Sequence, residues 1–192
     1  FRAPLRDKPF ARFLLVFALW VFAQSVAGPF FTVYMLETLR LSFFQVQLLN
    51  GIAGVVALIM MPAVGFLADK YGNKPIYVIA YGIVTTLPLF WALTRTDMPW
   101  LTWTLIVAVQ ILTGVVNAAM GLTQFNLMLA LSRPDQTARY SAVWGTAVGV
   151  AGFLGPLMGG VIADATLNVN IPAGGFNIGA YKITFLVSAA LR

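Results

Sequence analysis

The sequence contains no cysteine and no histidine. The absence of cysteine excludes disulfides and thiolate metal sites, and the absence of histidine removes the commonest general base and metal ligand. Charged side chains are also scarce: they make up 9% of the 192 residues, and only 6 of them are carboxylates. The chain therefore has few side chains that could act in catalysis, and we predict a non-enzyme with no catalytic residue, no metal site and no cofactor.

Long uncharged runs stand where a soluble protein would have charge. Hydrophobic residues make up 60% of the chain, and its mean hydropathy is +0.86; a soluble domain is about 25% charged. Several runs exceed the roughly 20 residues that a helix needs to cross about 30 Å of hydrocarbon. The sequence therefore predicts an all-α fold, a polytopic membrane helix bundle.

Polar turns divide the chain into six apolar segments. The fourth is long, but no cluster of turn residues interrupts it, so we expect one helix there. The region 164–181 is rich in Asn, Gly and Pro and indicates an external loop. The last segment is too short to cross a membrane, and the chain does not begin with Met, so we expect a fragment of a longer protein. The expected spans are 13–36, 42–68, 75–93, 99–131, 140–163 and an incomplete 182–192.

Alternating these spans across the bilayer sorts the basic residues into two sets. Three of them, Arg40, Arg95 and Lys182, fall on one side. Eight others fall on the opposite side, together with the N-terminal segment. Since short cytoplasmic loops carry an excess of Lys and Arg, this side with eight basic residues is predicted to be cytoplasmic. The net charge of +6 does not indicate a nucleic-acid partner, because the basic residues form no continuous stripe. The basic residues on the predicted cytoplasmic side are Arg2, Arg6, Lys8, Arg12, Lys70, Lys74, Arg133 and Arg139.

The turn between the second and third spans is the most informative feature. Residues 65–75 read GFLADKYGNKP, in which Gly65 permits close helix contact and Gly72 permits a tight turn. Asp69 lies at a helix C-terminus, where the macrodipole disfavours a carboxylate by a few tenths to about 1 kcal/mol. We therefore expect a positive partner for Asp69, either Arg139 or the N-terminus of the fifth span.

This turn resembles the loop signature of the major facilitator superfamily, G-x-x-x-D-R/K-x-G-R/K-R/K. Gly65, Asp69, Lys70, Gly72 and Lys74 match it, and Asn73 departs from the first of the two final basic positions. The resemblance implies a C-terminal six-helix half built from two inverted three-helix repeats, with its last helix truncated and an N-terminal six-helix half missing. It also implies that Asp69 anchors a neighbouring helix and helps to close the cytoplasmic side.

Small residues are frequent in the fifth span. The segment resembles the glycine-proline segment common in the fifth span of each superfamily half. Small residues on one helical face favour close packing in lipid, and we prefer helix packing over a dedicated coupling function. The residues are Gly145, Gly149, Gly152, Gly155, Pro156, Gly159 and Gly160.

Amides recur every seven residues along the fourth span. Gln110, Asn117 and Gln124, with Thr113 between them, lie on one helical face, because seven residues complete nearly two turns. Amides that faced hydrocarbon would be costly, so this face must meet protein or a water-filled cavity. Interhelical hydrogen bonding and substrate contact remain open alternatives. The resemblance implies that the first, second, fourth and fifth helices line a central cavity, which Gln24, Ser25 and Asn50 would join.

These observations predict transmembrane transport of a small solute by alternating access, with proton or sodium as a coupling ion. No charged side chain occurs deep in a complete span, so we expect any titrating group in the absent half, or at Glu37 or Asp164. The alternative is a non-transporting membrane sensor or scaffold with the same fold. We expect an integral multi-pass protein of the plasma (bacterial inner) membrane, whose partners are the bilayer, the missing half and a small-molecule substrate.

Overall fold

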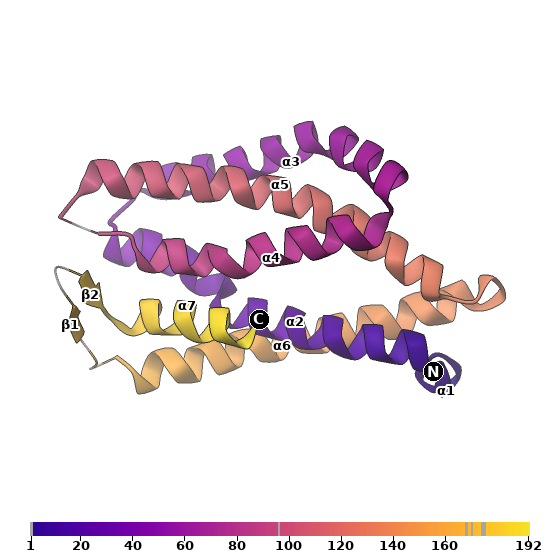
Figure 1. Ribbon diagram of the computed structural model, residues 1–192. Coiled ribbons are helices and arrows are strands. Elements are labelled where there is room, and N and C mark those ends of the chain that lie inside the picture. The colour runs from indigo at the N-terminus through magenta and orange to yellow at the C-terminus, as the bar shows by residue number, and fades with distance from the viewer. Residues whose placement is uncertain (1, 96, 168, 170, 174–175) are drawn as a thin grey trace.

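The computed structural model describes residues 2–95, 97–167, 169, 171–173 and 176–192. For residues 2, 3, 171–173 and 176–178 it describes the backbone only. The expected all-α membrane bundle is confirmed. Helices α2 to α7 run back and forth along a common direction (Figure 1). The helices are α1 Arg2–Arg6, α2 Lys8–Val33, η1 Tyr34–Thr38 (π-helical), α3 Phe43–Tyr71, α4 Asn73–Ala92, α5 Pro99–Leu131, η2 Pro134–Gln136 (3₁₀), α6 Thr137–Ala165 and α7 Ala180–Leu191.

Among the described residues, five helical segments are long and apolar enough to cross a membrane, and α7 is a shorter apolar helix. Their surfaces carry many exposed large hydrophobic side chains, such as Phe44, Leu58 and Phe153. Exposed apolar surface on this scale is unusual for a soluble monomer. It suits helices whose outer faces lie in lipid.

Several helix boundaries differ from the sequence expectation. The first helix begins at Lys8, and its regular part ends at Val33, after which η1 continues to Thr38. The sixth helix, α6, begins at Thr137 because η2 leads directly into it. The expected loop 164–181 also contains a short antiparallel hairpin of β1 (Ile171–Ala173) and β2 (Phe176–Ile178), which the turn-rich composition did not indicate.

Local signals in the sequence explain the ends of α3. Ser42 and Gln45 form a capping box: the Ser42 hydroxyl accepts the Gln45 N–H at 3.3 Å, and the Gln45 side chain accepts the Ser42 N–H at 2.8 Å. At the other end, Gly72 has a φ of +87°, a conformation that glycine adopts without steric cost. The Gly72 N–H still bonds to the Ala68 carbonyl at 2.8 Å, so the chain turns directly from α3 into α4.

The helices pack in two groups of three (Figure 1). One contains α3, α4 and α5, and the other contains α2, α6 and α7. The two groups contact each other mainly through α4 and α7. A buried aromatic cluster joins them there: Phe185 of α7 stacks on Phe31 of α2 at 4.4 Å between ring centroids, and Trp91 of α4 lies 5.2 Å from Phe31.

Candidate functional site

The amide face of α5 has two parts with different surroundings. Gln110 is buried, and its Nε2 donates to Oδ1 of Asn50 on α3 at 3.0 Å. One turn further along, Gly114 approaches α3 so closely that a Cβ there would lie 2.6 Å from the Ala53 carbonyl oxygen. The structure thus brings together two of the predicted residues, Gln110 and Asn50, as an interhelical hydrogen bond inside the α3–α5 pair.

The remaining polar positions are more accessible. Asn117 is exposed and Gln124 is half-buried on α5, and Gln24 and Ser25 are half-buried on α2. Within the described part of the chain, the side chains of Asn117, Gln124 and Gln24 make no hydrogen bond. Thr113 is different, because its hydroxyl donates to the Val109 carbonyl at 2.7 Å in its own helix. The three unbonded amides can therefore bind water or a solute.

The small residues of α6 do not share one partner. Cβ atoms at Gly155 and Gly159 would collide with the backbone of α2: at Gly155 the nearest atoms are the Ser25 Cβ at 2.5 Å and the Phe22 carbonyl oxygen at 2.7 Å. By contrast, a Cβ at Gly145, Gly149, Gly152 or Gly160 would meet nothing within 4 Å. Pro156 is half-buried. The close contact with α2 therefore depends on Gly155 and Gly159, and the other four glycines lie in open surroundings.

The signature turn (residues 65–75) is connected to α5 by a hydrogen bond of Asn73, the residue that departs from the loop signature. Nδ2 of Asn126 on α5 donates to Oδ1 of Asn73 at 3.0 Å. Lys70 lies over its neighbour Tyr71, with Nζ 5.2 Å from the ring centroid. Gly65 is half-buried, and Asp69 and Lys74 are exposed.

The expected contact between Asp69 and Arg139 is not formed in this conformation. Both side chains are exposed, and neither makes an ion pair within the described residues. At this end of the bundle a different carboxylate, Asp7, joins the N-terminal segment to α6: it accepts the Tyr140 hydroxyl at 2.9 Å and lies 3.9 Å from Nε of Arg133. Tyr140 is fully buried and packs edge-on against Phe10, with ring centroids 4.6 Å apart.

A second polar network closes the opposite end of the bundle. The Tyr34 hydroxyl bonds to Thr94 Oγ1 at 2.7 Å, and the buried Lys182 of α7 donates to the Thr94 carbonyl at 2.7 Å. The Tyr181 hydroxyl donates to Glu37 at 2.5 Å. These bonds connect η1, the end of α4 and the start of α7. They therefore tie the two helix groups together at this end.

The adjacent α4–α5 turn carries a two-pronged ion pair. Arg95 donates from Nε and Nη2 to the two carboxylate oxygens of Asp97 at 2.9 and 2.5 Å. These hydrogen bonds hold the pKa of the Asp97 carboxyl below its ordinary value. The turn therefore carries little net charge.

Sequence reasoning missed Asp7, Asn126, Tyr140 and Lys182 as contact residues. Asp7 offered one signal, because it is the single carboxylate in the basic N-terminal segment. The others offered none, since their partners are 53 to 133 positions away in the sequence. Among the described residues, no group of three His, Cys, Asp or Glu side chains could hold a metal ion.

Several known proteins are similar in sequence to part of this chain. An uncharacterized MFS-type transporter of Mycobacterium tuberculosis is 24% identical over 169 residues, 84% of this chain and 28% of that protein. The methylenomycin A resistance protein of Bacillus subtilis is 27% identical over 132 residues, 65% of this chain and 27% of that protein. Multidrug resistance protein 3 of the same species is 26% identical over 132 residues, 66% of this chain and 24% of that protein.

This chain thus spans about a quarter of the length of the curated relatives it matches. The model of one family, described as Major Facilitator Superfamily, matches residues 13–191, from the second turn of α2 to the end of α7. The match includes every long helix of the bundle and the turn that carries Asp69. The protein is a membrane protein that belongs to the major facilitator superfamily.

Proposed function

We propose that this chain is the C-terminal six-helix half of a transporter that carries a small solute across the membrane by alternating access. The observation that carries the proposal is the family match over residues 13–191. The match covers about a quarter of each relative's length, which leaves room for a further six-helix half in a protein of that length. In such transporters, two halves rock around a site near the bilayer midplane.

The substrate we propose is a small, largely apolar organic compound recognised by neutral hydrogen bonds. Two relatives are named for resistance to methylenomycin A and to multiple drugs, which supports export of a drug-like organic compound. The unbonded amides of Gln24, Asn117 and Gln124 are neutral donors and acceptors suited to contacting it. A proton or sodium gradient would drive export, and Glu37, Asp164 or a residue outside this chain would bind the ion.

Flux measurements on the full-length protein test this function. Reconstituted in liposomes with an imposed proton or sodium gradient, it should move Nile red, a neutral lipophilic fluorophore, faster than protein-free liposomes. Asn117→Ala and Gln124→Ala should each raise KM about 2- to 10-fold, because each removes one hydrogen bond worth about 0.5–1.5 kcal/mol. Thr86→Ala is the matched control: Thr86 is exposed on α4, its hydroxyl bonds within its own helix, and KM should not change.

Absence of gradient-dependent flux, for Nile red and for a panel of antibiotics, would contradict transport and favour a sensor or scaffold. Flux with an unchanged KM in both amide variants would contradict only the substrate site. The two failures are therefore distinguishable.

We further propose that Asp69 and Arg139 belong to a gate on the cytoplasmic side. Both side chains are exposed without an ion pair in the part of the chain described, so each is available to a partner that approaches during the transport cycle. Gly65, Lys70, Gly72 and Lys74 shape the turn that presents Asp69.

Asp69→Asn keeps the shape of the side chain and removes its charge. We expect it to lower the transport rate and shift the populations of inward-open and outward-open states, measured by spin-label distances across the cytoplasmic side. Asp135→Asn, an exposed carboxylate at the same end, should change neither. If Asp69→Asn also left both quantities unchanged, the gate role would be wrong.

A further inference from the structure

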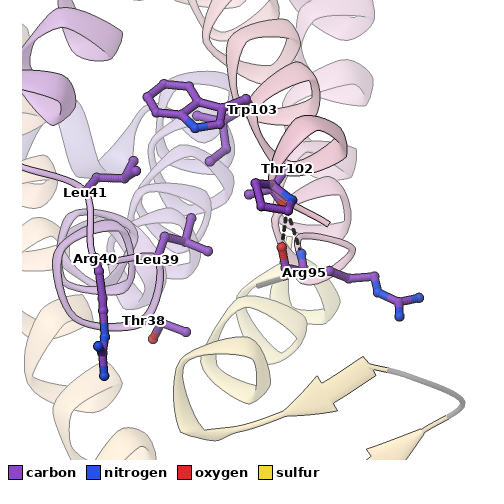
Figure 2. A pocket seen from close by; sticks show the side chains of 9 residues that line it. Thr38, Leu39, Arg40, Leu41, Arg95, Thr102 and Trp103 are labelled. Carbon is purple, nitrogen blue, oxygen red and sulfur yellow. Dashed lines mark hydrogen bonds between the residues drawn. The ribbon is translucent and has the colours of Figure 1, made fainter. Parts of the chain in front are cut away.

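A pocket of about 450 Å³ lies at the end of the bundle that carries the α4–α5 turn. One of its walls is the connection from η1 to α3. The facing wall is formed by the α4–α5 turn and the first two turns of α5 (Figure 2). The residues on which its chemistry depends are Leu39, Arg40, Leu41, Thr102, Trp103 and Ile106.

Arg40 is the unusual residue of this pocket. Its φ of +53° places it in the left-handed region, where no other non-glycine residue described here lies. Hydrogen bonds on either side hold this conformation: the Leu39 N–H bonds to the Tyr34 carbonyl at 3.1 Å and the Leu41 N–H to the Met35 carbonyl at 3.0 Å. Strained backbone persists where its surroundings fix it, often at binding sites. Here it presents the Arg40 side chain at the pocket.

The charge of Arg40 is not compensated within the described residues. Its side chain is exposed and makes no ion pair or hydrogen bond there. The other arginine of the pocket, Arg95, is held by Asp97 at 2.5 Å. The hydroxyl of Thr102 is also occupied, because it accepts the Arg95 N–H at 2.9 Å and donates to the Arg95 carbonyl at 2.5 Å. Arg40 is therefore the group best placed to receive an anion.

Most of the other side chains of the pocket are apolar and can pack against a hydrocarbon chain. Leu39, Leu41 and Ile106 are apolar, and the Trp103 indole is 37% exposed. Tryptophan is enriched at the boundary between the headgroups and the acyl chains of a bilayer. Arg40 and Trp103 both line the pocket, and Figure 2 shows them well apart, with the Arg40 side chain extending away from the indole. The pocket therefore has a cationic end and an apolar end, as an amphiphile requires.

We propose that this pocket binds one anionic phospholipid, with its headgroup phosphate on the Arg40 guanidinium and an acyl chain against Trp103 and Ile106. Arginine matches phosphate geometry because its planar fork donates two parallel hydrogen bonds. A soluble phosphate would gain nothing from the apolar walls, whereas a lipid would bury its acyl chain there. The site is independent of the solute path proposed above.

Lipid binding to the full-length protein, purified in detergent, tests this site. We expect native mass spectrometry to show one phosphatidylglycerol bound about tenfold more tightly to the wild type than to Arg40→Gly, and no such difference for phosphatidylcholine. Glycine adopts the left-handed conformation freely, so this variant removes the charge without straining the backbone. Arg40→Lys keeps the charge but not the fork and should bind with intermediate affinity.

Arg12→Gln is the matched control, since Arg12 is an exposed arginine near the other end of α2 and its loss should leave the tight phosphatidylglycerol in place. Equal affinity of the wild type and Arg40→Gly would overturn the proposal. Displacement of the lipid by equimolar glycerol phosphate would show that a soluble phosphate is the ligand and overturn the lipid assignment.

A second measurement tests whether the acyl chain lies against Trp103. Phosphatidylglycerol that carries bromine on the acyl chain, close to the headgroup, should quench tryptophan fluorescence in the wild type and quench it less in Trp103→Phe. Equal quenching in the two proteins would contradict the placement of the chain against Trp103.

Discussion

At the scale of the residue, glycines set how closely the helices approach. Gly155 and Gly159 let α6 lie against the backbone of α2, and Gly114 does the same for α5 and α3. Because lipid supplies no hydrophobic force between helices, such close packing is a main source of association in a membrane. The seven other helical glycines of α3 and α6, such as Gly54 and Gly149, lie in open surroundings and have no such role.

Gly155→Ala should destabilise the protein by about 1–3 kcal/mol, as overpacking of a tight contact does. The added Cβ would lie 2.7 Å from the Phe22 carbonyl oxygen, and backbone cannot move aside cheaply. Gly149→Ala is the control: its Cβ meets nothing within 4 Å, so we expect stability equal to or above that of the wild type, since alanine favours helix. Thermal unfolding in detergent measures both, and equal melting temperatures would contradict the packing role.

At the scale of the element, polar contacts join segments that apolar packing alone would leave free to slide. Asp7 and Tyr140 join the N-terminal segment to α6, Asn73 and Asn126 join the signature turn to α5, and Lys182 joins α7 to the end of α4. A neutral hydrogen bond contributes about 0.5–1.5 kcal/mol, and one to a charged group about 1.5–3 kcal/mol. These few contacts therefore define helix register more than they add stability.

Tyr140→Phe should lower the free energy of unfolding by about 1–3 kcal/mol, because it removes the donor to Asp7 while keeping the ring against Phe10. Tyr71→Phe is the control, as Tyr71 is exposed and its hydroxyl makes no hydrogen bond among the described residues. Denaturant titration followed by circular dichroism measures the difference. Identical midpoints for Tyr140→Phe and the wild type would show that the Asp7 contact contributes nothing.

At the scale of the whole molecule, the two ends of the bundle differ in charge. The α3–α4 and α5–α6 turns lie at one end, and the α4–α5 turn and the β1–β2 hairpin lie at the other (Figure 1). The first end carries most of the basic residues. By the positive-inside rule, we propose that this end is cytoplasmic.

The natural absence of cysteine permits a direct test of this orientation. In the full-length protein, with any cysteine outside this chain removed, the Lys74→Cys variant should react with a membrane-impermeant maleimide only in inside-out vesicles. The Asp97→Cys variant should react only in right-side-out cells. Labelling of both from the same side, or with the two sides exchanged, would contradict the proposed topology.

The sequence by itself determined which segments become membrane helices and where the chain turns. These are local matters: the length of an apolar run, the capping box at Ser42 and Gln45, and the glycine at position 72 each act within a few residues. The π-helical end of the first helix and the β1–β2 hairpin carried no such local signal. They were not expected.

Only the tertiary structure decided which face of each helix meets which partner. The regular amide spacing on α5 left interhelical bonding and cavity lining equally open, and the structure gives Gln110 to Asn50 while leaving Asn117 exposed. Likewise, Gly155 meets α2 and Gly149 does not. The reason is physical: hydropathy and helix propensity act on each segment alone, whereas rotation and register depend on the close packing of two helices at once.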